Sequence, residues 1–78
     1  MKIVVYGPGC TNCKKTFEAA KDAVTTLGVD AEVVKIEDIQ KMMEAGVMGT
    51  PALEIDGKIV STGKRLSVER IKKLISEV

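Results

Sequence analysis

The sequence predicts an α/β fold with the element order βαβαββα, in a single domain that spans residues 1–78. Runs rich in β-branched residues, which are typical of strands, alternate along the chain with apolar residues at helical spacing. A helical pattern from about Thr11 to Leu27 separates the first two strand-like runs, and a helix of this length is the usual crossover between parallel neighbours. Asp56 and Gly57, between two apolar runs, indicate a two-residue hairpin with both residues at positive φ. The expected sheet is therefore mixed, with four strands and three helices on its faces.

The strands and the first helix follow from local composition. The first helix should bury one apolar stripe and end at Gly28, because glycine readily adopts the left-handed conformation that closes a helix. Val33 and Val34 are adjacent in the second strand, and we expect both to be buried. The expected strands are Lys2–Tyr6, Ala31–Ile36, Ala52–Ile55 and Lys58–Ser61. The residues of the stripe are Phe17, Ala20, Val24 and Leu27.

Each of the two remaining helices is predicted by a cap residue and an apolar stripe. Asp38 can cap a short helix over Ile39–Ala45, which Gly46 ends. Ser67 can cap the last helix in the same way. The residues expected to face the sheet from the short helix are Ile39, Met42 and Met43. The stripe expected in the last helix is Val68, Ile71, Leu74, Ile75 and Val78.

Composition argues against several classes of function. Lys and Arg total 12 against 11 acidic residues, and a net charge of +1 gives no reason to expect a nucleic acid or a membrane surface as the partner. The first apolar run, residues 3–6, is too short for a signal sequence or a spanning helix. We therefore expect a cytoplasmic protein. Because that compartment keeps thiols reduced, two cysteines there seldom form a structural disulfide.

The only two cysteines, Cys10 and Cys13, lie where the first strand ends and the first helix begins. Residues three apart share one face of a helix, so the two sulfurs can meet in its first turn. That turn carries unsatisfied backbone N–H groups and the positive end of the helix dipole, which both stabilise a thiolate, the reactive form of cysteine. Lys14 and Lys15 add positive charge. The pattern indicates a redox dithiol, with Cys10 nearer to solvent and Cys13 shielded on the side of Phe17.

Other interpretations of this stretch are available from the residues alone. Buried cysteines can be small core hydrophobes, but the glycines around these two make a poor core. A zinc site needs four ligands, and the chain has two cysteines and no histidine. A phosphate-binding loop requires Gly directly before Lys-Ser/Thr, and here Cys13 or Lys14 stands in that place. We therefore do not expect metal binding to be the main function of this stretch.

A soft-metal carrier is the alternative that belongs to a different class of function. Copper carriers also place a C-x-x-C between a first strand and a first helix, and soft thiolates suit Cu(I). Those domains resemble βαββαβ and carry Met shortly before the first cysteine. This chain is expected to end on a helix and has Gly7-Pro8-Gly9 at that place.

The chain resembles the thioredoxin superfamily over nearly its whole length, in its element order and in two motifs. They are Cys10-Thr11-Asn12-Cys13 after the first strand and Gly49-Thr50-Pro51 before the third. Residues 6–13 are most similar to the small, glutaredoxin-like redox-active disulfide proteins of archaea and bacteria. The resemblance implies a thioredoxin-like fold with the strand order 2-1-3-4. It also implies a cis Thr50–Pro51 bond, which leaves the backbone of Thr50 available to an extended substrate strand.

The resemblance also implies a thiol–disulfide oxidoreductase. Cys10 would be the nucleophile, Cys13 the resolving thiol, and the two would form a disulfide in the oxidised protein. Thr50 and Pro51 would bind the substrate. The dithiol carries two electrons itself, so no bound cofactor is expected. The expected partners are disulfide-containing proteins as substrates and a flavoprotein like thioredoxin reductase, which reduces the disulfide back to the dithiol. The protein is expected to be a monomer.

Two features depart from the pattern of thioredoxins proper. Those proteins carry Trp before the first cysteine and Gly-Pro between the pair, where this chain has Gly9 and Thr11-Asn12. They also place an acid, as a proton acceptor, on the buried strand that leads into the site, and residues 2–6 contain none. Tyr6 ends that strand, and we expect it to be half-buried beside the site.

Overall fold

Four strands form one mixed sheet with the order β2-β1-β3-β4, which confirms the order predicted from the sequence. The structure, a computed structural model, describes residues 1–9 and 11–77. Its elements are β1 (Lys2–Tyr6), α1 (Thr11–Leu27), β2 (Glu32–Ile36), α2 (Ile39–Glu44), β3 (Ala52–Ile55), β4 (Lys58–Ser61) and α3 (Val68–Ser76). Among the helices that this part of the chain contains, none is long and apolar enough to cross a membrane.

The central strand β1 brings together segments that are far apart in the sequence. It runs parallel to β2, with Tyr6 opposite Ile36, and antiparallel to β3, with Tyr6 opposite Ala52. The β3–β4 hairpin turns through Asp56 at φ 50° and Gly57 at φ 85°, as the Asp-Gly pair predicts. The C-terminal ends of β1 and β2 and the start of β3 therefore lie at the same end of the sheet.

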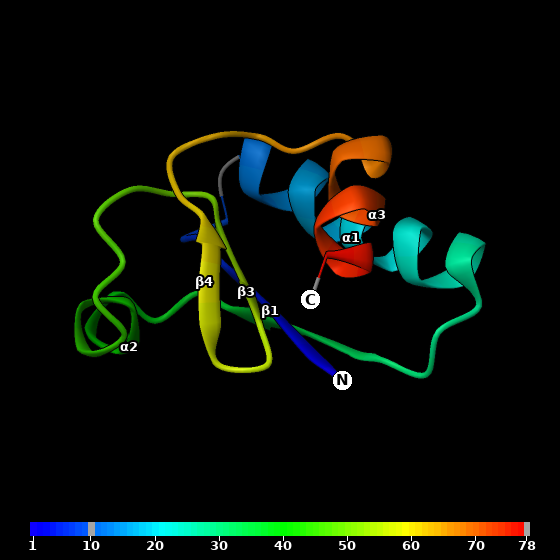
Figure 1. The fold of residues 1–78 in the computed structure, drawn as a ribbon. Coiled ribbons are helices and arrows are strands. Elements are labelled where there is room, and N and C mark those ends of the chain that lie inside the picture. The colour runs from blue at the N-terminus through cyan, green and yellow to red at the C-terminus, as the bar shows by residue number, and fades with distance from the viewer. Residues whose placement is uncertain (10, 78) are drawn as a thin grey trace.

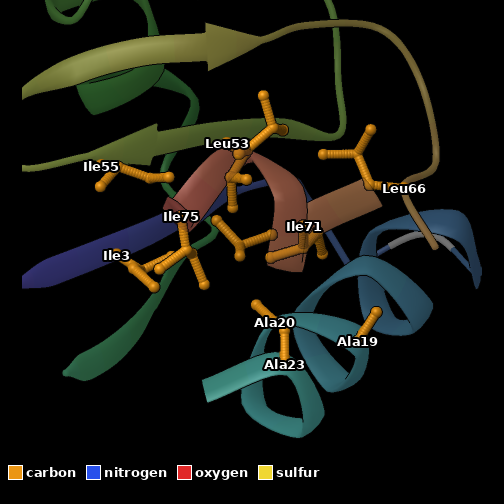
Figure 2. Close-up of a cluster of buried hydrophobic side chains, with 11 residues drawn as sticks. Ile3, Ala19, Ala20, Ala23, Leu53, Ile55, Leu66, Ile71 and Ile75 are labelled. Carbon is orange, nitrogen blue, oxygen red and sulfur yellow. The ribbon is translucent and has the colours of Figure 1, made fainter. Parts of the chain in front are cut away.

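The helices divide between the two faces of the sheet. Figure 1 shows α1 and α3 packed together on one face, while α2 lies apart from them. Three alanines of α1 approach α3 and the sheet, where Ile71 is fully buried (Figure 2). Small side chains allow this close approach, so Ala19, Ala20 and Ala23 form the centre of the buried stripe. The larger Phe17, Val24 and Leu27 lie at its margin and are only half-buried, which corrects the predicted stripe.

The opposite face carries a smaller core, which α2 covers incompletely. Its buried residues are Val4, Tyr6, Met42 and Ala52. The expectation that Ile39 and Met43 also face the sheet is wrong, because their side chains are 63% and 73% exposed. A helix of six residues has fewer than two turns, so only Met42 points at the sheet.

Caps and edges explain the remaining boundaries. Asp38 accepts a hydrogen bond from Gln40 N at the start of α2, and Ser67 accepts one from Arg70 N at the start of α3, as predicted. Val33 and Val34 are only half-buried, contrary to expectation, because β2 is an edge strand. The predicted burial of Val78 lies outside the described residues.

Candidate active site

The dithiol motif follows β1 in the sequence and extends into the first turn of α1. Residues 7–9 follow the last residue of β1, and α1 begins at Thr11, so the motif lies where the strand ends and the helix begins, as the sequence predicts. Cys13 lies in the first turn of α1 with its side chain 3% exposed. Cys10 lies outside the described residues, so its role and its disulfide with Cys13 stay predictions.

Gly7 provides the space that Cys13 occupies. A Cβ built on Gly7 would lie 2.6 Å from the Cβ of Cys13 and would also collide with its Sγ. Real Cβ atoms do not approach this closely, so the Cys13 side chain packs directly on the glycine backbone. The Gly7 N–H donates to the carbonyl of Ile36 over 2.9 Å, which continues the β1–β2 pairing by one residue. A hydrogen bond to β2 therefore holds the Gly7 backbone in place, and the side chain of Cys13 packs against this backbone.

The peptide bond between Thr50 and Pro51 is cis, which confirms the prediction for this bond. Pro51 is buried, and its carbonyl accepts a hydrogen bond of 3.0 Å from the Gly63 N–H. Because Ala52 pairs with Tyr6, Thr50 and Pro51 lie at the same end of the sheet as Gly7. The structure thus brings Cys13, Thr50 and Pro51 to one end of the molecule.

An apolar groove of about 250 Å³ adjoins this turn. Pro8 and Thr50 line it on the side of the dithiol motif. Ile39, Met43 and Met48 also line it, and these are three large apolar side chains that solvent reaches freely. Sequence patterns do not indicate this groove, because amphipathic spacing predicts that Ile39 and Met43 face the core.

A hydrogen bond links Tyr6 to the β3 strand. The Tyr6 hydroxyl donates to Glu54 Oε1 over 3.1 Å, and its side chain is almost fully buried rather than half-buried as expected. Burial raises the pKa of Tyr6 above its ordinary value, and the hydrogen bond to Glu54 and the charge of that carboxylate raise it further. Val4 pairs with Glu54 and Tyr6 pairs with Ala52, so the register of β1 and β3 brings Glu54 near Tyr6. Local sequence patterns do not show this register.

Glu37 is a second acid near the motif that the sequence reasoning missed. Its Oε2 would lie 3.2 Å from a Cβ built on Gly9, the residue before Cys10. It follows Ile36, the last residue of β2, so only the parallel register with β1 brings it to the motif.

The described residues contain no group of three or more His, Cys, Asp or Glu side chains that could hold a metal ion. The copper-carrier alternative is not supported, because the described elements follow the order βαβαββα, with a helix between β2 and β3, whereas copper carriers resemble βαββαβ.

A βαβαββα fold with a C-x-x-C at the start of α1 beside a cis-proline turn defines a thioredoxin-like protein. Comparison with known proteins agrees, since residues 1–76 match the family described as thioredoxin domain. The chain is 43% identical to a thioredoxin of Methanothermobacter thermautotrophicus over 76 residues, which are 97% of this chain and 99% of that protein. It is 45% identical to a thioredoxin of Methanocaldococcus jannaschii over 71 residues, 91% of this chain and 81% of that protein. The chain belongs to the thioredoxin family.

Proposed function

We propose that this protein reduces disulfide bonds in other proteins, with Cys10 as the attacking sulfur and Cys13 as the resolving sulfur. Membership of the thioredoxin family makes it a thiol–disulfide oxidoreductase. The observation that carries the assignment is the placement of Cys13, which is buried one turn inside α1 and packs on Gly7. A shielded sulfur suits the second, intramolecular step, which leaves Cys10, three residues earlier in the sequence, for attack on an external disulfide.

The proposed cycle moves two electrons from the dithiol to the substrate. The Cys10 thiolate attacks one sulfur of the substrate disulfide, that bond breaks, and the departing substrate sulfur takes up a proton. A mixed disulfide then joins Cys10 to the substrate. Cys13 loses its proton and attacks the Cys10 sulfur, which releases the second substrate sulfur as a thiol and forms the Cys10–Cys13 disulfide. The substrate has gained two electrons and two protons, and the dithiol has lost them.

The substrate strand would bind at Thr50 and Pro51. β3 begins at Ala52, one residue after Pro51, so the backbone of Thr50 lies just beyond the paired part of the sheet. An extended peptide can form backbone hydrogen bonds with a residue such as Thr50, which precedes the paired part of β3. The groove lined by Pro8, Met43 and Met48 adjoins Thr50 and supplies apolar contact for side chains that flank the substrate cysteine.

The proposed partners follow from this cycle. Disulfide-containing proteins are the substrates, and a flavoprotein like thioredoxin reductase returns the Cys10–Cys13 disulfide to the dithiol. We place the protein in the cytoplasm as a monomer, where a reductase can keep the dithiol reduced. The dithiol transfers the electrons itself, so the cycle uses no bound organic cofactor.

Metal-free protein tests the proposal directly. We expect protein prepared with a chelator to catalyse the reduction of an insulin-like disulfide substrate by a small dithiol, at a rate that depends on protein concentration. The Cys10→Ser variant, prepared in the same way, is the matched control and should be inactive. Disulfide reduction only after addition of Cu(I) or Zn²⁺ would refute the proposal and favour a metal carrier instead.

A further inference from the structure

The carboxylate of Glu37 lies against the loop that carries the dithiol. Gly9 adopts φ 90°, a conformation that favours glycine, and a Cβ at this position would lie 3.2 Å from Glu37 Oε2. Gly9 is covalently bonded to Cys10, so the carboxylate is placed within one residue of the proposed nucleophile.

Lys35 holds this carboxylate in place. Lys35 Nζ lies 3.2 Å from Glu37 Oε1, and it also lies 5.4 Å from the centroid of the Phe17 ring on α1. The hydrogen bond from Gly7 N–H to Ile36 O fixes the residue immediately before Glu37 against β1. Glu37 is therefore restrained from both sides, by a cation that is itself packed on α1 and by the paired backbone of β2.

The other charged groups around the loop are mostly basic. The first turn of α1 contains no acid, and its N–H groups and dipole form the positive end that stabilises a thiolate. Asp38 caps α2 through Gln40 N, and Glu54 bonds Tyr6 on the α2 face of the sheet. The charged residues at the ends of these elements next to the loop are Lys14 and Lys15 on α1, Lys35 and Glu37 at the end of β2, and Asp38 at the start of α2.

We propose that the Lys35–Glu37 pair sets the reactivity of the Cys10 thiol. The Glu37 carboxylate opposes formation of the Cys10 thiolate, and Lys35 limits this opposition because it binds the carboxylate and partly neutralises it. This inference rests on the proposed function in one respect, namely that Cys10 is the attacking sulfur. Glu37 is a positioning residue in this scheme, because it acts on the thiol through its charge and takes no part in bond exchange.

The size of the effect follows from the exposure of the pair. The side chains of Lys35 and Glu37 are 38% and 52% exposed, so water and salt screen their charges in part. The charge of Glu37 therefore acts on the Cys10 thiol in partly screened form, and we expect its effect on the thiolate fraction near neutral pH to be modest. The carboxylate makes Cys10 less reactive at neutral pH than the helix terminus alone would make it.

Charge-changing variants of the pair test this inference. The rate at which iodoacetamide alkylates Cys10 in the fully reduced protein is measured against pH, with peptide mass spectrometry to separate Cys10 from Cys13. Glu37→Gln should lower the midpoint of the profile, and Lys35→Gln should raise it. Both shifts should shrink in high salt. Opposite signs are diagnostic, because merely structural damage would not reverse direction between the two variants.

Glu32→Gln is the matched control. Glu32 lies at the opposite end of β2, is exposed, and loses the same charge; its profile should match that of the unaltered protein. If Lys35→Gln unfolds, Lys35→Met keeps the apolar stem over Phe17 and serves in its place. Shifts of one sign for both members of the pair, or a Glu37→Gln profile equal to that of Glu32→Gln, would overturn the inference.

The assay separates this inference from the proposed function. Alkylation measures the Cys10 thiol with no disulfide substrate present. Loss of disulfide reduction with the opposite shifts intact would refute the function alone, whereas normal disulfide reduction without the shifts would refute the charge effect alone.

Discussion

Gly7 and Cys13 share one small volume at the end of β1, where a Cβ on Gly7 would lie 2.6 Å from the Cβ of Cys13. The glycine is six residues before the cysteine, and the loop and first turn of α1 fold the cysteine back onto it. Gly7 is not among the residues at positive φ, so its backbone conformation is open to any residue type. The requirement for glycine at this position is therefore steric, and it comes from the sulfur-bearing side chain.

Gly7→Ala should displace Cys13 and slow disulfide exchange. The added methyl group overpacks a buried contact, so we expect a loss of about 1–3 kcal/mol in the free energy of unfolding. Urea unfolding of the reduced variant measures the stability, and the disulfide-reduction assay measures the exchange. Gly46→Ala is the control, because Gly46 has φ 79° and open space around it; that variant should lose stability through backbone strain and keep its exchange rate. Equal exchange rates for Gly7→Ala and the unaltered protein would contradict the steric role.

Tyr6 should titrate above its ordinary pKa. It is the only tyrosine in the chain, so the tyrosinate absorbance reports this residue alone. Burial is the main cause of the raised pKa, and the hydrogen bond and charge of Glu54 add to it. Glu54→Gln removes the charge and should move the midpoint down toward 10 without reaching it, because the burial remains. A midpoint unaffected by Glu54→Gln would show that the carboxylate contributes nothing.

The same shift should make the folded protein sensitive to alkaline pH. The unfolded chain gives up the tyrosine proton at an ordinary pKa near 10, whereas the folded protein keeps that proton to a higher pH. The stability linked to Tyr6 is therefore fully present below pH 10 and is lost as the pH rises through the folded pKa. Tyr6→Phe cannot ionise, so its unfolding free energy should fall less steeply over this range. Parallel curves for the two proteins would count against the linkage.

The apolar groove beside Thr50 should matter for protein substrates alone. Met43 and Met48 are 73% and 94% exposed, so replacing both with Gln removes apolar surface at little cost to the fold. We expect KM for an insulin-like substrate to rise severalfold, with kcat nearly unchanged, because the contact contributes to binding and not to the exchange chemistry. A small-molecule disulfide serves as the control substrate and should be reduced at the original rate. A matching loss with both substrates would place the methionines in the chemistry or the fold instead.

Local signals predicted most of the fold because their causes lie within a few residues. Asp56-Gly57 specifies its hairpin, Ser67 caps α3, and Gly28 ends α1 at φ 67°. The cis bond before Pro51 was expected only through the resemblance to a family, since the residues around it carry no such signal. The predictions that were wrong concerned which apolar residues are buried. The bounds predicted for α2 were right to within one residue, but helical spacing does not show that so short a helix buries only Met42 and leaves Ile39 exposed.

The contacts that shape the candidate site join segments that the sequence separates. Glu37 reaches Gly9 because β2 pairs with β1 in parallel register, and Glu54 reaches Tyr6 because β3 pairs with β1 in antiparallel register. Neither register is visible in a local pattern, so a sequence alone identifies the dithiol and leaves the charges around it unassigned. Gly7 carried a weak signal, as one of two glycines before Cys10, but nothing in the sequence indicated that Cys13 fills its side-chain space.

The two cysteines should fail in different ways when each is replaced by serine, and this comparison is the sharpest test of the mechanism. Cys10→Ser removes the attacking sulfur and should abolish both exchange and rapid alkylation. Cys13→Ser keeps the attack but lacks the thiol that releases the product, so it should accumulate a mixed disulfide between Cys10 and the substrate. Mass spectrometry of each variant after incubation with a disulfide substrate distinguishes the two results. An adduct on Cys10→Ser and none on Cys13→Ser would reverse the roles. No adduct on either variant would mean that this dithiol does not catalyse exchange, because attack without resolution must leave the substrate attached to the protein.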